Sequence, residues 1–300
     1  MMFLYDHSSI EPYGEFVIRF SDDFGIRWYG FLIMLGALTA YFVGTLGAKK
    51  LNVKKELLLD GFIWGLLLGV IGARLWYVLF NLDSFSNPLH IITRFTDGGL
   101  AIHGGIFVGA IYAYFYCKKH KINPFKIAEL LFPGFMIGQA FGRWGNFMNQ
   151  EATGGLVPGY PNLDAQREWF SSKLIPDFIT NQMYFGSGST SSTNPQVGYY
   201  HPTFLYESLW NVVGLAIVLL LRKFSKKYWV GDAMFFYLVW YSIGRYFIEG
   251  MRTDSMYAGS LRTAQVVSIV LIIVGIVGFI LRRVYRVYPM SYLNFNEEVK

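Results

Sequence analysis

The sequence is poor in charged residues. Only 15% of its 300 residues are Asp, Glu, Lys or Arg, whereas 53% are hydrophobic and the mean hydropathy is +0.34. A soluble domain of this size carries more charge. The composition therefore excludes an ordinary soluble protein. It predicts an all-α integral membrane protein, because helices satisfy every backbone polar group internally.

Cysteine and metal-ligand motifs are also scarce. The one cysteine, Cys117, has no disulfide partner and suits a small apolar packing residue. The histidines are far apart in the sequence, no His-Glu-x-x-His motif occurs, and no glycine-rich nucleotide loop is present. We therefore expect neither a metal nor another cofactor. Any chemistry must use arginine, histidine, carboxylate, tyrosine and asparagine side chains.

Long hydrophobic runs, in contrast, are abundant. A transmembrane helix needs roughly 17–25 mainly apolar residues. Windows that approach or exceed this length lie at about 28–48, 57–80, 99–117, 131–148, 205–221, 231–248 and 264–281. The sequence thus predicts one transmembrane domain over 1–300, with seven transmembrane helices. Residues 1–27 are too polar for a cleavable signal peptide, so we expect no cleavage.

Basic residues are distributed unevenly between the predicted loops. Sixteen of the 26 lysines and arginines fall in 49–55, 118–126, 222–227 and 282–300. Cytoplasmic loops retain positive charge, so this asymmetry places the N-terminus outside and the C-terminus in the cytoplasm. The net charge of +6 follows mostly from the same asymmetry. We interpret this charge as a consequence of the membrane topology and of contact with anionic membrane lipids, not as a sign of nucleic-acid binding.

One predicted external segment, 150–204, is much longer than the other loops. Its first half mixes aromatic and charged residues, which predicts a small folded external cap between spans four and five. Its second half contains a Gly-Ser-Thr run at 186–194, whose composition is typical of a flexible linker.

An unusual group of polar residues closes the fourth hydrophobic window. The run Gly-Arg-Trp-Gly-Asn-Phe-Met-Asn-Gln-Glu occupies 142–151. Ionisable groups at membrane depth are costly, so such a cluster is by default a functional site. Helical spacing predicts one stripe suited to an anion, formed by Gln139, Arg143, Asn146 and Gln150.

Polar residues of the other windows converge at the same depth. The predicted topology places the following residues in or beside the outer half: Tyr29, Arg74, His103, Arg143, Asn146, His201, Glu207, Arg245, Glu249 and Arg252. Groups that only hold helices together would be scattered in depth. The convergence therefore predicts one site that faces the outer leaflet. Its guanidinium groups suit bidentate phosphate binding.

Several members of this group also have a purely structural explanation. His103 suits a hydrogen-bonded interfacial position, although Gly104 and Gly105 beside it allow close approach of a ligand or backbone. Arg245 and Glu249, four residues apart, suit a buried salt bridge. Tyr29 also suits the aromatic belt at the membrane interface.

Four motifs resemble those of a known family. They are Gly142-Arg143-Trp144-Gly145-Asn146-Phe147-Met148-Asn149-Gln150-Glu151 with Gly154, Asp97-Gly98-Gly99-Leu100 leading into His103-Gly104-Gly105, His201-Pro202-Thr203-Phe204-Leu205-Tyr206-Glu207, and Gly244-Arg245-Tyr246-Phe247-Ile248-Glu249 with Arg252. In this order, over about 25–255, they are similar to the motifs of bacterial prolipoprotein diacylglyceryl transferases. The resemblance implies seven spans in the bacterial cell membrane and an external N-terminus, in agreement with the charge asymmetry.

The resemblance also implies an activity. Members transfer the diacylglyceryl group of phosphatidylglycerol to the lipobox cysteine of a prolipoprotein signal peptide, and glycerol phosphate leaves. By position, Arg143 and Arg245 are the expected headgroup and leaving-group residues. His103 is a proposed base, for which Glu151 or the substrate phosphate are alternatives. The expected substrate-binding residues are Arg143, Tyr29, Asn146, Glu151, Gly154, Glu249, Arg252 and Glu207.

Two other functional classes remain as alternatives. An anionic-lipid transporter or receptor would use the same arginines, but its path would need polar groups in the inner half. There the sequence indicates only loop lysines and apolar spans. An intramembrane protease would need a serine placed with His103, or two aspartates at one depth, and the predicted spans offer neither. A transferase fits the sequence best.

Overall fold

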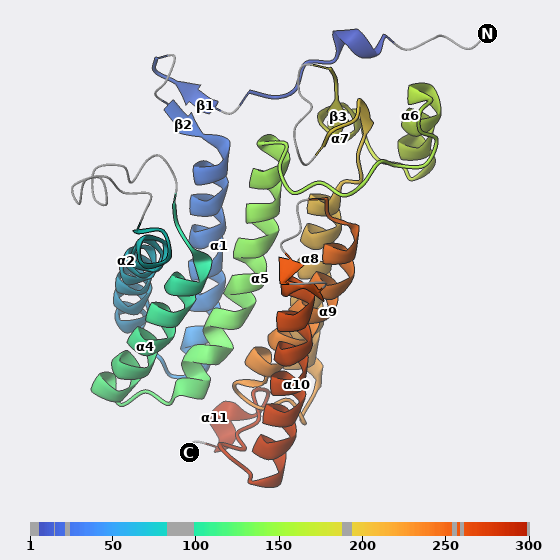
Figure 1. The fold of residues 1–300 in the computed structure, drawn as a ribbon. Coiled ribbons are helices and arrows are strands. Elements are labelled where there is room, and N and C mark those ends of the chain that lie inside the picture. Colours follow the sequence, from blue (N-terminus) through green and yellow to red (C-terminus); the bar gives the residue numbers. More distant parts are fainter. Residues whose placement is uncertain are drawn as a thin grey trace.

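The computed structural model describes residues 6–14, 16–21, 25–82, 99–187, 194–253, 257–258 and 261–298. Within these ranges the architecture is mainly helical, as predicted (Figure 1). The long helices are α1 (Trp28–Lys50), α2 (Lys55–Phe80), α4 (Ile102–His120), α5 (Pro124–Met148), α8 (Thr203–Phe224), α9 (Asp232–Met251) and α10 (Thr263–Val284). Each of them overlaps one of the predicted hydrophobic windows.

Four of these helices, α1, α2, α8 and α10, are long and apolar enough to cross a membrane. They expose much of their apolar surface, and only 11% of the most apolar stretch of α10 is buried inside the protein. Apolar side chains that face outward are unfavourable in water but not among lipid tails. The described part of the chain is therefore that of a helical membrane protein.

Helix α5 is longer than the sequence predicts, since it begins at Pro124 and not near 131. The side chain of Asn123 caps it by accepting a hydrogen bond from the Phe125 N–H at 2.9 Å. Proline in the first turn supports this start, because its fixed φ suits a helix and its missing N–H is not needed there. Lys126 and Glu129 lower the hydropathy of this first part, so hydropathy alone places the start too late.

Some helices that pack against each other are not consecutive in the sequence. Helix α1 packs against α5, α2 against α4, α5 against α8, and α9 against α10. Gly72 and Gly104 let α2 and α4 approach closely, since a Cβ added at Gly104 would lie 2.3 Å from the Gly72 carbonyl oxygen. Helix α5 contacts α1, α8 and α9, so side chains from its end meet side chains of α8 and α9.

The segment between α5 and α8 folds at one end of the bundle (Figure 1). It contains α6 (Leu163–Ser172), α7 (Asp177–Gln182) and the antiparallel strands β3 (Tyr184–Phe185) and β4 (Gly198–Tyr199). Its core consists of Phe147, Val157, Phe170, Ile179, Met183, Tyr199 and Phe204. The predicted linker run lies partly outside the described residues, at 188–193.

One short helix and two hairpins near this end were not predicted. They are η1 (His7–Ser9), the hairpin of β1 (Phe16–Arg19) with β2 (Gly25–Arg27), and the hairpin of β5 (Tyr257–Ala258) with β6 (Leu261–Arg262). The two hairpins immediately precede α1 and α10.

The C-terminal segment, for which the sequence predicts only a basic, cytoplasmic position, folds back on the opposite end of the bundle. It ends in α11 (Phe295–Glu298), and Phe295 is fully buried. Backbone hydrogen bonds join it to the loop before α9, from Val230 N–H to the Met290 carbonyl and from Tyr292 N–H to the Tyr228 carbonyl, both at 2.9 Å. The segment is thus part of the fold.

Candidate active site

Glu207 joins two arginines at the end of the bundle that carries the α6–α7 segment. Its Oε2 lies 2.7 Å from Arg143 Nε, and its Oε1 lies 3.2 Å from Arg245 Nη1. The three residues come from α5, α8 and α9, so the packing of these helices creates the cluster. Only 6% of the Glu207 side chain is exposed, which strengthens both ion pairs relative to a surface pair.

Arg143 is held by a second partner on its own helix. Its Nη1 donates to Asn146 Oδ1 at 3.0 Å, and Asn146 Nδ2 donates to Glu151 Oε2 at 3.3 Å. Asn149 donates to the other oxygen of Glu151 at 3.2 Å. The helix ends at Met148, so Glu151 can fold back onto the last turn. This chain of contacts fixes the plane of the Arg143 guanidinium.

Arg245 is also held from two sides. In addition to Glu207, it pairs with Glu249 one turn further along α9, with Nη2 and Oε2 2.5 Å apart. Glu249 is 2% exposed, and its backbone carbonyl accepts a hydrogen bond from Arg262. The predicted i,i+4 pair therefore exists, but it belongs to a larger cluster and is not an isolated salt bridge.

Gly154 and Arg252 connect the ends of three elements. They face each other in an isolated antiparallel bridge. Gly154 N–H donates to the His201 carbonyl at 3.0 Å, and Gly155 N–H donates to the Met251 carbonyl at 3.0 Å. This small backbone ladder ties the segment after α5 to the start of α8 and the end of α9, and so supports the arginine cluster.

The Gly154→Ala change is expected to distort this ladder. A Cβ at Gly154 would lie 2.7 Å from His201 Cβ and 3.3 Å from the Met251 carbonyl oxygen. Overpacking of this kind costs about 1–3 kcal/mol of stability, so thermal unfolding of the purified variant should occur at a lower temperature. Gly155→Ala is the matched control, because nothing lies within 4 Å of its added Cβ. Equal unfolding temperatures of the two variants would contradict the prediction that an added Cβ at Gly154 distorts the backbone ladder.

His201 and Tyr29 lie beside the cluster. His201 Nδ1 lies 3.2 Å from the Tyr206 hydroxyl, and Trp169 packs edge-on against the imidazole. Burial lowers the pKa of His201, so the ring is neutral at neutral pH. The Tyr29 ring packs on the backbone of Gly145, where an added Cβ would lie 2.5 Å from Tyr29 Cδ2. Gly145 therefore makes room for Tyr29 beside the last turns of α5.

His103 is not brought into this cluster. It lies at the start of α4, its side chain is exposed, and it makes no hydrogen bond or ion pair with any described residue. The Asp97-Gly98 part of its motif lies outside the described residues. Arg74, another predicted member, donates to the Gly99 carbonyl at 3.1 Å and thus supports the start of the α4 segment.

The predicted polar stripe on α5 is only partly right. Arg143 and Asn146 do lie on one face, but Gln150 falls beyond the helix end and has a positive φ of 52°. Its side chain instead donates to the carbonyls of Gln182 and Tyr184. Gln139 donates to the Tyr237 hydroxyl at 2.7 Å. The chain reversal after Met148 therefore splits a pattern that looks continuous in the sequence.

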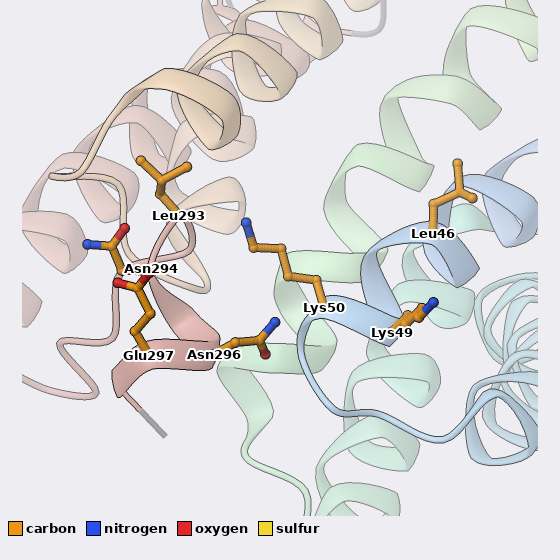
Figure 2. Close-up of a pocket in the computed structure, with 7 residues that line it drawn as sticks. All are labelled: Leu46, Lys49, Lys50, Leu293, Asn294, Asn296 and Glu297. Atoms are coloured by element: carbon orange, nitrogen blue, oxygen red, sulfur yellow. The ribbon is translucent and has the colours of Figure 1, made fainter. Parts of the chain in front are cut away.

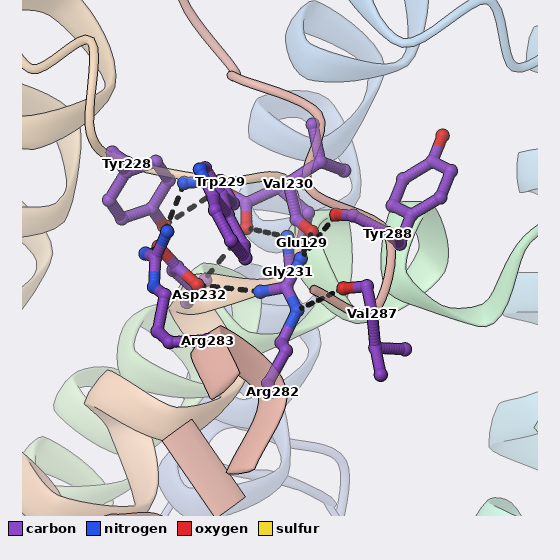
Figure 3. A network of polar contacts seen from close by, with 11 residues as sticks. Glu129, Tyr228, Trp229, Val230, Gly231, Asp232, Arg282, Arg283, Val287 and Tyr288 are labelled. Atoms are coloured by element: carbon purple, nitrogen blue, oxygen red, sulfur yellow. Dashed lines mark hydrogen bonds and ion pairs between the residues drawn. The ribbon is translucent and has the colours of Figure 1, made fainter. Parts of the chain in front are cut away.

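A second ionic cluster, which the sequence did not predict, lies at the opposite end of the bundle, where α9 begins and α10 ends. Figure 3 shows its contacts. Glu129 is fully buried and accepts hydrogen bonds from Arg222 Nε at 2.7 Å and from the Gly231 N–H at 2.6 Å. Asp232 pairs with Arg282, 2.6 Å away, and with Arg283. The expectation that this end holds only loop lysines and apolar spans is therefore wrong.

The contacts of this second cluster are structural in character. Arg282 also donates to the carbonyls of Val230 and Tyr288, and Glu129 also accepts from the Tyr228 hydroxyl. These bonds join the ends of helices and loops, and they occupy the carboxylate oxygens. The distribution of charge assigned Arg222, Arg282 and Arg283 to topology alone, and it could not reveal buried acidic partners far away in the sequence.

The first cluster has donors that an anion could use. Among the described residues, Arg143 Nη2 and Arg245 Nε have no hydrogen-bond partner, although both side chains are mostly buried, with 20% and 17% exposed. Two guanidinium groups fixed on opposite oxygens of one carboxylate can bind a phosphate between or beside them. Within the described residues, no group of three His, Cys, Asp or Glu side chains has metal-site geometry.

Comparison with known proteins shows which family the chain resembles. Residues 15–281 match the family model described as prolipoprotein diacylglyceryl transferase. Similar proteins named phosphatidylglycerol–prolipoprotein diacylglyceryl transferase occur in Staphylococcus saprophyticus subsp. saprophyticus (43% identity, covering 86% of each chain) and Lysinibacillus sphaericus (42%, covering 90% of this chain and 92% of the relative). The relative from Streptococcus uberis is 40% identical, with 89% and 94% covered.

Proposed function

Because the chain belongs to the prolipoprotein diacylglyceryl transferase family and is a transferase of lipoprotein biosynthesis, we propose that its donor is phosphatidylglycerol and its acceptor a prolipoprotein. The acceptor atom is the thiol of the lipobox cysteine, and glycerol phosphate leaves. The observation that carries this proposal is the pair of arginines held by Glu207, with donors left over for a phosphate.

The proposed reaction is a displacement at carbon. The lipobox thiolate attacks C3 of the diacylglyceryl group, a C–S bond forms, and the C3–O bond breaks. The electron pair moves to the departing phosphate oxygen, where Arg143 and Arg245 stabilise the growing negative charge. Removing one such preorganised donor typically costs about 2.7–4 kcal/mol of transition-state stabilisation. Glu207, Glu249 and Asn146 act here by orienting the arginines.

A transfer assay tests the reaction itself. Purified protein in detergent is given phosphatidylglycerol labelled in its acyl chains, together with a lipobox peptide. A matched peptide with serine in place of the cysteine is the control, because a hydroxyl is far less nucleophilic than a thiolate at neutral pH. We expect label on the cysteine peptide alone. A folded protein that labels neither peptide favours the alternative function, an anionic-lipid transporter or receptor.

The proposed base is His103, which would take the thiol proton once substrate is bound. Its exposed position at the start of α4 leaves it accessible, although it contacts neither arginine. A general base typically contributes a factor of about 10²–10⁴. We expect His103→Gln to lower kcat by at least about 10²-fold, and Glu151→Gln to lower it less. An unchanged rate in His103→Gln would exclude the histidine and leave Glu151 or the substrate phosphate.

The other expected site residues have supporting positions. Tyr29 and Gly145 shape the wall beside the last turns of α5. Glu151 continues the chain of contacts from Arg143 through Asn146. Gly154 and Arg252 form the backbone bridge beneath the cluster.

The proposed topology has seven transmembrane helices in a single catalytic domain over 1–300. The N-terminus and the cap, 150–204, lie outside, the C-terminus lies in the bacterial cytoplasm, and the active site faces the outer leaflet. Three observations support it: the overlap of the long helices with the hydrophobic windows, the basic residues of 49–55, 118–126, 222–227 and 282–286 at one end, and the position of the arginine cluster at the other.

Labelling of single cysteines tests this orientation. In a Cys117→Ser background, Lys173→Cys lies in the proposed cap and Lys226→Cys in a proposed cytoplasmic loop, and both positions are exposed. A thiol reagent that does not cross membranes should label intact cells carrying the first variant only. Labelling of the second alone would reverse the proposed orientation.

A further inference from the structure

A groove opens where α1 ends, at the end of the bundle opposite to the arginine cluster. Figure 2 shows the residues that line it. It lies between the last turn of α1 and the C-terminal segment, and its volume is about 480 Å³. Its lining residues are Leu46, Lys49, Lys50, Leu293, Asn294, Asn296 and Glu297. None of them takes part in the proposed transfer chemistry, so the groove needs its own explanation.

The C-terminal wall of the groove is fixed by buried contacts. Phe295 is fully buried, and Lys126 Nζ lies 4.9 Å from the centre of its ring. Tyr292, 8% exposed, is bonded through its backbone to Tyr228. The same tyrosine ring holds Lys50, whose Nζ lies 4.9 Å from the ring centre. The ammonium of Lys50 is therefore positioned on a preformed surface.

An exposed apolar stripe of α1 leads to this groove. Leu38, Phe42 and Leu46 follow each other at intervals of four residues and are 54%, 63% and 64% exposed. Lys50 continues the same helical face by one more turn. Because α1 is apolar and long enough to cross a membrane, this stripe faces lipid tails. A lipid whose acyl chain lies along this stripe therefore has its headgroup at the groove.

The charges and polar groups of the groove specify the kind of headgroup. Lys49 and Lys50 supply two positive charges against the single negative charge of Glu297, so an anion is favoured. The carboxamides of Asn294 and Asn296 can bond polar groups beside a phosphate. We propose that this groove binds the headgroup of one anionic phospholipid, with an acyl chain along Leu38, Phe42 and Leu46. The proposal requires that α1 spans the membrane and does not depend on the transferase function.

Native mass spectrometry of the full-length protein in neutral detergent tests this proposal. The probe is dioleoylphosphatidic acid, with dioleoylphosphatidylcholine as the neutral lipid. Phosphatidylglycerol is avoided because it is the proposed substrate, and all proteins are compared in an Arg143→Ala background, so that the arginine cluster does not hold the lipid phosphate with both guanidinium groups. A basic residue near a membrane surface contributes about five-fold to the binding of an anionic lipid. We expect Lys49→Gln to weaken binding of the first phosphatidic acid about five-fold, and Lys49→Gln with Lys50→Gln about thirty-fold.

The matched control is the pair Lys54→Gln with Lys55→Gln. These lysines are exposed in the same basic segment but do not line the groove, so binding should stay as in the parent. An equal loss in both double variants would mean a diffuse surface charge and would overturn the proposal. Lys49→Gln leaves the contact between Lys50 and Tyr292 intact, so its result does not depend on that contact.

A third comparison separates a lipid from a free anion. Leu46→Gln removes apolar surface at the mouth of the groove without changing its charge. Binding of phosphatidic acid should weaken in this variant, and inorganic phosphate at the same concentration should not compete. If phosphate competes equally well and Leu46→Gln binds lipid as the parent does, the groove is a site for free anions and the proposal is wrong.

Discussion

Replacing Arg143 by alanine is expected to lower diacylglyceryl transfer about 10²–10³-fold while the protein remains folded. The magnitude is that of one lost preorganised donor to a developing oxyanion. Folding should survive, because Glu207 keeps its second partner, Arg245, at 3.2 Å and is not left as an unpaired buried charge. The initial rate of labelled-lipid transfer to the lipobox peptide measures the effect.

Two variants control this prediction. Arg143→Lys keeps the charge but loses the planar fork that contacts Glu207 and Asn146 together, so it should recover only part of the activity. Arg286→Ala removes an exposed arginine at the other end of the bundle and should have the activity of the parent. If a folded Arg143→Ala protein transfers at the parental rate, the arginine pair does not hold the leaving group.

Replacing Glu129 by alanine should have the opposite effect, a large loss of stability without a loss of chemistry. Glu129 is fully buried and pairs with Arg222, which is also buried. Removing one partner of such a pair leaves an uncompensated charge and costs about 3–5 kcal/mol. The unfolding temperature in detergent should fall sharply, while the transfer rate per folded molecule stays near that of the parent.

The double variant Glu129→Ala with Arg222→Met separates lost charge pairing from lost packing. It removes both charges, so it should unfold at a higher temperature than Glu129→Ala alone. Glu56→Ala, at an exposed position in the first turn of α2, should unfold like the parent. A Glu129→Ala protein with parental stability would mean that the second ionic cluster does not hold the helix ends together.

The sequence predicted the helical architecture well because hydropathy reports directly on burial in lipid. Every predicted window overlaps a long helix, with the largest error at the polar start of α5. The convergence of Arg143, Arg245 and Glu207 was also predicted, since helix spacing and topology together assign a depth to each residue. Their assembly around one carboxylate is the new element that the structure adds.

Features that depend on long-range contacts were missed. Nothing local indicates that Glu129 meets Arg222, 93 positions later, or that the C-terminal segment packs on the loop before α9. Gln150 was assigned to a helical stripe because periodicity does not reveal the chain reversal after Met148. His103 was grouped with the arginines by its depth, its flanking glycines and the family resemblance, and none of these fixes the direction in which a side chain points.

The central claim is that the arginine pair stabilises a departing phosphate. The most direct test uses phosphatidylglycerol that is labelled both in its glycerol headgroup and in an acyl chain. The purified protein is incubated with this lipid and a lipobox peptide, and both labels are followed. The account predicts acyl label on the peptide and headgroup label released as water-soluble glycerol phosphate in equal amounts. Both labels on the peptide, or release of headgroup without peptide modification, would contradict it.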